Sequence, residues 1–97
     1  MENMDYMIEV DGRSVLVEKV VEQKTRDVSD ELVDRLVAMR KAAGMTQQDI
    51  ADIVGLPRAN ISRLERKLYT PTLGILMKYA GSLGKRISLE LEDWESV

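Results

Sequence analysis

The 97-residue chain contains no cysteine and no histidine, and these two absences exclude several kinds of chemistry. Without cysteine there is no disulfide, thiol nucleophile or thiolate metal site, and without histidine the usual zinc ligand sets and Ser-His or Cys-His catalysis are missing. Glycine-rich phosphate loops are absent too. No apolar run approaches the length of a membrane span, and the N-terminus has no signal-peptide pattern. We therefore expect a cytoplasmic protein that is not an enzyme and holds no metal or cofactor.

Acidic and basic residues are strongly segregated along the chain, although the formal net charge is only −3. Residues 1–34 carry four Lys/Arg against ten Asp/Glu, and residues 87–97 carry none against four. Residues 35–86 carry ten Lys/Arg against three Asp/Glu, a net charge of +7. Because salt screens charges beyond roughly 8–10 Å, a basic middle can bind phosphates while acidic ends face elsewhere. An ordinary scatter of surface charge is the alternative interpretation.

Residues 45–65 have the pattern of two short helices joined by a tight turn. Thr46 is suited to cap the first helix, Gly55 to end it with a positive φ, and Pro57 to preset φ for the second. The apolar positions keep a helical period that would pack the pair together. They are Ile50, Ala51, Val54, Ile61 and Leu64. This pattern predicts a helix-turn-helix, whose second helix enters the DNA major groove, whereas a pair of core helices with solvated arginines is the alternative.

The chain before this pair is predicted to contain a β-hairpin and a helix. Asp11-Gly12 separates two alternating apolar runs and predicts a hairpin from Met4 to Val20. Its apolar face would carry Tyr6, Ile8, Val10, Val15 and Val17. The polar residues 18–27 are expected to be extended or loop-like. A helix from about Asp30 to Ala43 should follow, with Ser29 as its N-cap.

After the pair, the sequence predicts one further helix and then a strand. Thr72 is a suitable cap for a helix that ends near Leu83. Its inward side is expected to consist of Leu73, Leu76, Met77, Ala80 and Leu83. From residue 85 to residue 92 the period changes to two, which predicts a strand whose apolar face holds Ile87, Leu89 and Leu91. This strand could join the hairpin of its own chain or pair with its copy in a second chain.

These elements predict a mainly α fold with small β content. We expect a four-to-five-helix domain of the helix-turn-helix type with an N-terminal β-hairpin and a C-terminal β-strand. The expected division is a hairpin and linker at 1–28, a helix-turn-helix domain at 29–84, and a strand with an acidic tail at 85–97.

Residues 32–84 resemble the lambda-repressor-like, Cro-type helix-turn-helix family, also called the XRE family. The resemblance rests on an arginine in the first helix, the words GMTQ and ISRLE, the turn glycine, and a proline-containing loop before a last amphipathic helix. The continuation KRISLELE is similar to antitoxins of the HipB and HigA types, in which a strand follows the last helix.

The resemblance implies roles for individual residues. The DNA contacts that it implies are Gln47, Arg58, Ala59, Asn60, Ser62, Arg63 and Lys67. Gln47 would contact a phosphate and brace the second helix of the pair. Arg58 and Ala59 would touch base edges, since arginine can bond guanine bidentately and an alanine methyl group can make an apolar contact with thymine. Arg40 and Glu65 match a family ion pair that joins the first helix to the second helix of the pair.

The leading hypothesis is a sequence-specific repressor that acts as a homodimer on a two-fold DNA operator, with its own promoter as an expected target. The alternative is an antitoxin that neutralises a toxin by protein contact, because acidic ends would suit a basic partner. For these ends, a role in solubility alone is the competing explanation. Ile87, Leu89 and Leu91 are the candidates for the dimer or partner contact.

Overall fold

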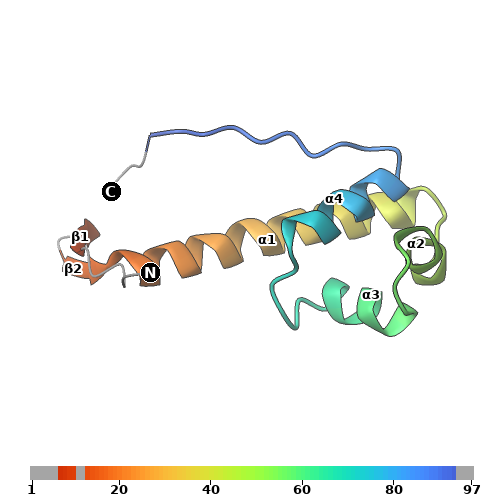
Figure 1. Ribbon diagram of the computed structural model, residues 1–97, viewed down its shortest axis with the longest axis horizontal. Helices are drawn as coiled ribbons and strands as arrows, with labels where there is room; N and C mark the ends of the chain where they lie inside the picture. The colour runs from red at the N-terminus through yellow and green to blue at the C-terminus, as the bar shows by residue number, and fades with distance from the viewer. Residues whose placement is uncertain (1–6, 11–12, 94–97) are drawn as a thin grey trace.

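The computed structural model describes residues 7–10 and 13–93, with side-chain environments from residue 21 onward. Four helices and two short strands occur in this part of the chain (Figure 1). In chain order they are β1 (Met7–Val10), β2 (Arg13–Leu16), α1 (Val17–Ala42), α2 (Gln47–Val54), α3 (Arg58–Glu65) and α4 (Leu73–Ser82).

Helix α1 is much longer than the sequence pattern predicts. It begins at Val17 and runs for 26 residues, so the predicted loop at 18–27 and the predicted N-cap at Ser29 were both wrong. Residues 18–27 are rich in Glu, Lys, Gln and Arg and contain no glycine or proline, which gives them good helix propensity despite their few apolar residues. Ser29 lies inside the helix, is 6% exposed, and its hydroxyl has no hydrogen-bond partner.

The core lies between the C-terminal half of α1 and the other three helices. Its buried apolar residues are Val33, Leu36, Ile50, Ala51, Ile61, Leu64, Leu76, Tyr79 and Ala80. The predicted contribution of α2 and α3 is therefore confirmed, whereas α4 is rotated relative to the prediction. Leu73 and Met77 are 47% and 42% exposed, and Tyr79 takes their place in the core at 0% exposure.

The expected fold class was wrong in its β content, because the core is formed by helices alone. No strand occurs between residues 17 and 93, so the predicted C-terminal strand is absent. Strands β1 and β2 are four residues each and pair antiparallel, with Ile8 opposite Val15. The expected hairpin reached Val20, but α1 already begins at Val17. The expected start at Met4, together with Tyr6 and the expected turn at Asp11-Gly12, lies outside the described residues.

Residues 85–93 form an extended segment that runs back along α1 toward its N-terminal end (Figure 1). The N–H of Lys85, at the start of this segment, donates a hydrogen bond to the carbonyl of Ala80 at the end of α4. Ile87 packs against the core, whereas Leu89 is 62% exposed and Leu91 is fully exposed. Alternating apolar residues supply only one face of a strand, and without a neighbouring strand this segment has no ladder of hydrogen bonds.

Candidate nucleic-acid interface

Helix α2 has strong local signals at both ends, and the structure confirms them. The Thr46 hydroxyl accepts a hydrogen bond from the N–H of Asp49 at 3.0 Å, and the Asp49 carboxylate accepts one from the N–H of Thr46 at 2.8 Å. This reciprocal capping satisfies two backbone donors that the first turn of a helix leaves free. Gly55 ends the helix at φ 83°, a conformation that other residues adopt only with strain. The turn into α3 is thereby set by residues close in sequence.

Helix α3 follows after Pro57, which is the N-cap residue at φ −61° and ψ 146° and has no side-chain cap of its own. The helix therefore begins at Arg58. Its inner face is fully buried, since Ile61 and Leu64 both have 0% exposure. The other side chains of the helix are turned partly or wholly outward, except that of Glu65, which is 7% exposed and points into the domain.

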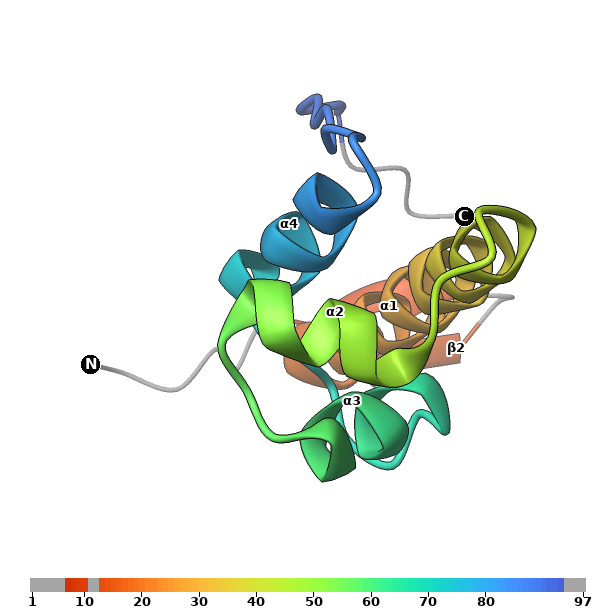
Figure 2. The same cartoon turned by 90° about the vertical axis from the view of Figure 1, so that its right-hand side faces the viewer.

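The outer face of α3 presents the side chains that the sequence selects as DNA contacts. Arg58, Ala59 and Arg63 are exposed, while Asn60 and Ser62 are half-buried. Arg63 Nη2 donates a hydrogen bond to Asn60 Oδ1 at 2.8 Å, so these two candidate residues are joined to each other. Figures 1 and 2 place α3 on the side of the molecule opposite segment 85–93. The chain's own extended segment therefore leaves the outer face of α3 uncovered.

Lys67 has an intramolecular partner. Its Nζ lies 2.8 Å from Asp34 Oδ1 of α1, and this hydrogen-bonded carboxylate raises the pKa of Lys67. The residue adopts φ 58°, an uncommon conformation for a side chain larger than glycine or asparagine. A phosphate contact through Lys67 would have to replace the contact with Asp34.

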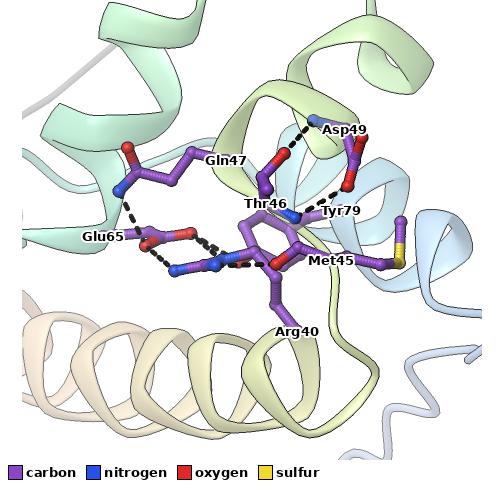
Figure 3. A network of polar contacts seen from close by, with 7 residues as sticks. All are labelled: Arg40, Met45, Thr46, Gln47, Asp49, Glu65 and Tyr79. Carbon is purple, nitrogen blue, oxygen red and sulfur yellow. Dashed lines mark hydrogen bonds and ion pairs between the residues drawn. The ribbon is translucent and has the colours of Figure 1, made fainter.

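Beneath the outer face lies a network of polar contacts that joins all four helices (Figure 3). Arg40 of α1 binds Glu65 of α3 through two bonds, Nε to Oε2 and Nη2 to Oε1, each 2.8 Å. Arg40 Nη1 also donates to the carbonyl of Met45 at 2.9 Å. Gln47 of α2 and Tyr79 of α4 donate to the two oxygens of Glu65 at 3.0 and 2.7 Å. The network fixes the position of α3 against the rest of the domain.

The ionisation of this network follows from its burial and its hydrogen bonds. The side chains of Arg40 and Glu65 are 10% and 7% exposed. Burial opposes ionisation of Glu65, but the hydrogen bonds from Arg40, Tyr79 and Gln47 outweigh it and lower the pKa of this carboxyl. The hydrogen bond to Glu65 raises the pKa of Arg40, and burial followed by the same carboxylate raises the pKa of Tyr79. The pair is therefore charged and the phenol neutral at neutral pH.

Sequence reasoning identified the ion pair and the bracing contact of Gln47 but missed Tyr79. The spacing of Thr72, Leu76, Tyr79 and Leu83 along α4 places Tyr79 on the same helical face as Leu76, and this signal was available. The contact of Asp34 with Lys67 carries no comparable sequence signal, because it depends on how two segments 33 residues apart meet.

The predicted dimer residues Ile87, Leu89 and Leu91 do not form one surface. Ile87 packs against the core, whereas the other two are exposed. Among the residues that the structure describes, no group of three or more His, Cys, Asp or Glu side chains could hold a metal ion. In the same part of the chain no helix has the length and apolar character needed to cross a membrane.

A capped helix, a glycine turn and a second helix with an exposed basic face, braced by a buried ion pair, define a helix-turn-helix unit. A family model for the helix-turn-helix matches residues 36–89, more than half of the chain. The chain belongs to this helix-turn-helix family. The predicted XRE-like helix-turn-helix class is confirmed.

Three relatives share this part of the chain. Antitoxin HigA1 of Mycobacterium tuberculosis is 36% identical over 61 residues, which cover 63% of this chain and 41% of that protein. An immunity repressor protein of Bacillus phage phi105 is 37% identical over 54 residues, 56% of this chain and 38% of that protein. An uncharacterized HTH-type transcriptional regulator of Methanothermobacter thermautotrophicus is 39% identical over 46 residues, 47% of this chain and 67% of that protein.

The chain thus spans about two fifths of the length of the first two of these relatives. No solved structure gives a significant match.

Proposed function

We propose that this protein is a sequence-specific DNA-binding repressor whose helix α3 reads the major groove. The observation that carries the proposal is the outer face of α3, where Arg58, Ala59 and Arg63 are exposed while the ion pair beneath holds the helix in place. Arginine can bond guanine O6 and N7 bidentately, and the small side chain of Ala59 lets the helix approach the bases closely. Asn60, Ser62, Gln47 and Lys67 complete the proposed interface as phosphate contacts.

The proposed mechanism is occlusion of a promoter, with the protein's own promoter as the first target to test. One recognition helix reads only a few base pairs, so useful specificity requires two half-sites about one DNA turn (~34 Å) apart. A homodimer supplies the matching two-fold symmetry. The side chains of Leu89, which is 62% exposed, and Leu91, which is fully exposed, are the proposed dimer contacts, since removing apolar surface from water is favourable.

A gel-shift titration against the DNA upstream of the gene tests this proposal. Replacement of Arg58 or Arg63 by alanine should weaken specific binding by about 1–3 kcal/mol and leave the stability of the fold almost unchanged, because both side chains are exposed. Arg26→Ala, on the exposed N-terminal half of α1, is the matched control and should bind normally. Equal affinity for operator and unrelated DNA would contradict the proposal.

A second proposed role is that of an antitoxin. It is supported by the likeness to a protein named Antitoxin HigA1 and by the acidic residues 1–34 and 87–97, which would attract a basic partner. The test is co-expression with the product of the neighbouring gene. A stable complex and relief of growth inhibition would support the role, whereas a neighbour that neither binds nor inhibits growth would contradict it.

A further inference from the structure

A groove lies between the middle of α1, the end of α4 and the first residues of segment 85–93. Its floor is apolar and includes Leu36 of α1 and Ala80 of α4, which are 3% and 1% exposed. Ile87 is half-buried and also lines it. Segment 85–93 runs back along α1, so residues 85–89 form one wall of this groove (Figure 1). We call it the α1 groove.

The volume of the α1 groove suits a small molecule. It is about 370 Å³. Sites for small molecules typically measure roughly 300–1,000 Å³ and are mostly apolar, with a few polar groups that fix the orientation of the ligand. At ~30 Å³ for one water molecule, the groove holds a ligand of about a dozen non-hydrogen atoms. An occupant with an apolar body would keep the floor of the groove out of water.

The charged residues that line the α1 groove are mostly basic. They are Arg35 of α1 with Lys85 and Arg86 of segment 85–93, against the one acidic residue Glu31. All four are exposed. Within the part of the chain that the structure describes, the side chains of the three cations form no ion pair. A carboxylate or a similar anion is the complementary group, because charge-assisted hydrogen bonds to Lys and Arg are strong.

The proposed DNA face does not account for these three cations. Figures 1 and 2 place α3 on the side of the molecule opposite segment 85–93. Lys85 and Arg86 belong to that segment, and Arg35 lines the same groove. DNA held by the outer face of α3 would therefore lie away from them, and a different anion is needed to explain the cluster.

We propose that the α1 groove binds a small amphipathic anion, with its apolar body on the groove floor and its carboxylate, or a similar acidic group, among the three cations. The inference goes beyond the proposed repressor function and does not depend on it. Leu89 also lines the groove and is a proposed dimer contact, so the tests change the cations and leave this leucine intact.

Titrations followed by NMR test which head group the groove prefers. Octanoate, octanol and octylammonium share one alkyl chain, and acetate carries the carboxylate without the chain. We expect saturable binding of octanoate with shifted amide signals at Leu36 and Ala80, at least about fivefold weaker binding of octanol and octylammonium, and no saturable binding of acetate. Equal affinity for octanoate and octylammonium, or no saturable binding of octanoate, would overturn the inference.

Variants of the cations locate the binding on the surface. Arg35→Gln/Arg86→Gln should weaken octanoate binding at least about fivefold, because two charges facing the carboxylate are lost. Lys41→Gln/Lys78→Gln is the matched control, since it removes two exposed charges of α1 and α4 that lie outside the groove. Circular dichroism should be unchanged in both variants, because all four side chains are exposed. Equal weakening by the control would overturn the assignment.

Three further measurements distinguish other occupants. Capture of the protein by vesicles of anionic phosphatidylglycerol without saturable octanoate binding would identify a membrane surface as the source of the anion. Dissociation of a dimer in Arg35→Gln/Arg86→Gln but not in the control would identify a second copy. Loss of operator binding confined to the same variant would assign the cations to DNA. Each of these results would overturn the inference, whereas a protein that binds octanoate but no operator would retain it and refute the proposed repressor.

Discussion

At the scale of single residues, Glu65 is the acceptor on which the interface depends. Its two oxygens receive hydrogen bonds from Arg40, Gln47 and Tyr79, and its side chain is 7% exposed. A carboxylate in such a place is stable only while its donors remain, because burial of an unpaired charge is costly. The side chains that would contact DNA are exposed, but the residues that orient them are inside.

Loss of one partner of the ion pair should destabilise the fold severely. Arg40→Met leaves Glu65 without its two hydrogen bonds from the guanidinium group. We expect a loss of about 3 kcal/mol in the free energy of unfolding, measured by urea titration. The double variant Arg40→Met/Glu65→Leu should be markedly more stable than Arg40→Met alone, because it removes the uncompensated charge. Equal stability of the single and double variants would contradict this account.

The same carboxylate predicts how stability depends on pH. Because the folded state lowers the pKa of Glu65, its contribution is fully present above the unfolded pKa of about 4.3 and is lost as the pH falls through the lower folded value. We therefore expect the free energy of unfolding to decrease on acidification below about pH 4. In Glu65→Gln the free energy of unfolding should depend less on pH over this window. An unchanged dependence in that variant would show that another group causes it.

At the scale of elements, the two ends of α2 carry stabilising local contacts, whereas the middle of α1 contains an unfavourable one. The capping contacts of Thr46 and the left-handed Gly55 stabilise a helix of only eight residues, which would be marginal alone. In α1 the hydroxyl of Ser29 is buried without a partner, which is unfavourable in a helix interior.

These two positions should respond to alanine in opposite ways. Thr46→Ala removes the reciprocal cap and should cost about 1 kcal/mol of stability. Ser29→Ala removes a buried hydroxyl that has no partner and improves helix propensity, so stability should stay equal or rise slightly. Thermal unfolding of the two variants beside the parent protein is the measurement. A large loss in Ser29→Ala would mean that its hydroxyl has a partner in solution.

At the scale of the whole molecule, α3 and segment 85–93 lie on opposite sides (Figure 2). Residues 35–86 carry a net charge of +7 and include α3, whereas the acidic residues of segment 85–93 are Glu90, Glu92 and Asp93. Because salt screens the interaction between exposed charges beyond roughly 8–10 Å, a protein with a net charge of −3 can still attract DNA through a basic face.

The proposed dimer is testable at this scale. Leu91→Asp places a charge on a fully exposed leucine of segment 85–93 and should shift a dimer toward monomer in analytical ultracentrifugation. Operator affinity should fall with it, because two half-sites would no longer be bound as a unit. Leu68→Asp, at a 60% exposed leucine outside the segment, is the control for dimerisation. A dimer that withstands Leu91→Asp would show that other residues form the contact.

Much of the helix-turn-helix could be predicted from the amino-acid sequence, because its signals are local. Thr46 as the cap, Gly55 as the turn residue, and the helical spacing of the apolar residues in α2 and α3 are each patterns within one element, and the structure confirms them. The ion pair of Arg40 and Glu65 was accessible through resemblance to the family, although 25 residues separate the two.

Only the tertiary structure decided the features that depend on contacts between distant segments. The polar residues 18–27 are helical because they continue α1, and residues 85–93 lack a strand because no neighbouring strand lies beside them. The inward position of Tyr79 and the contact of Lys67 with Asp34 likewise depend on how helices meet. The spacing of apolar residues and helix capping act within one element. A neighbouring strand, or a buried hydrogen-bond acceptor such as Glu65, must come from elsewhere in the chain.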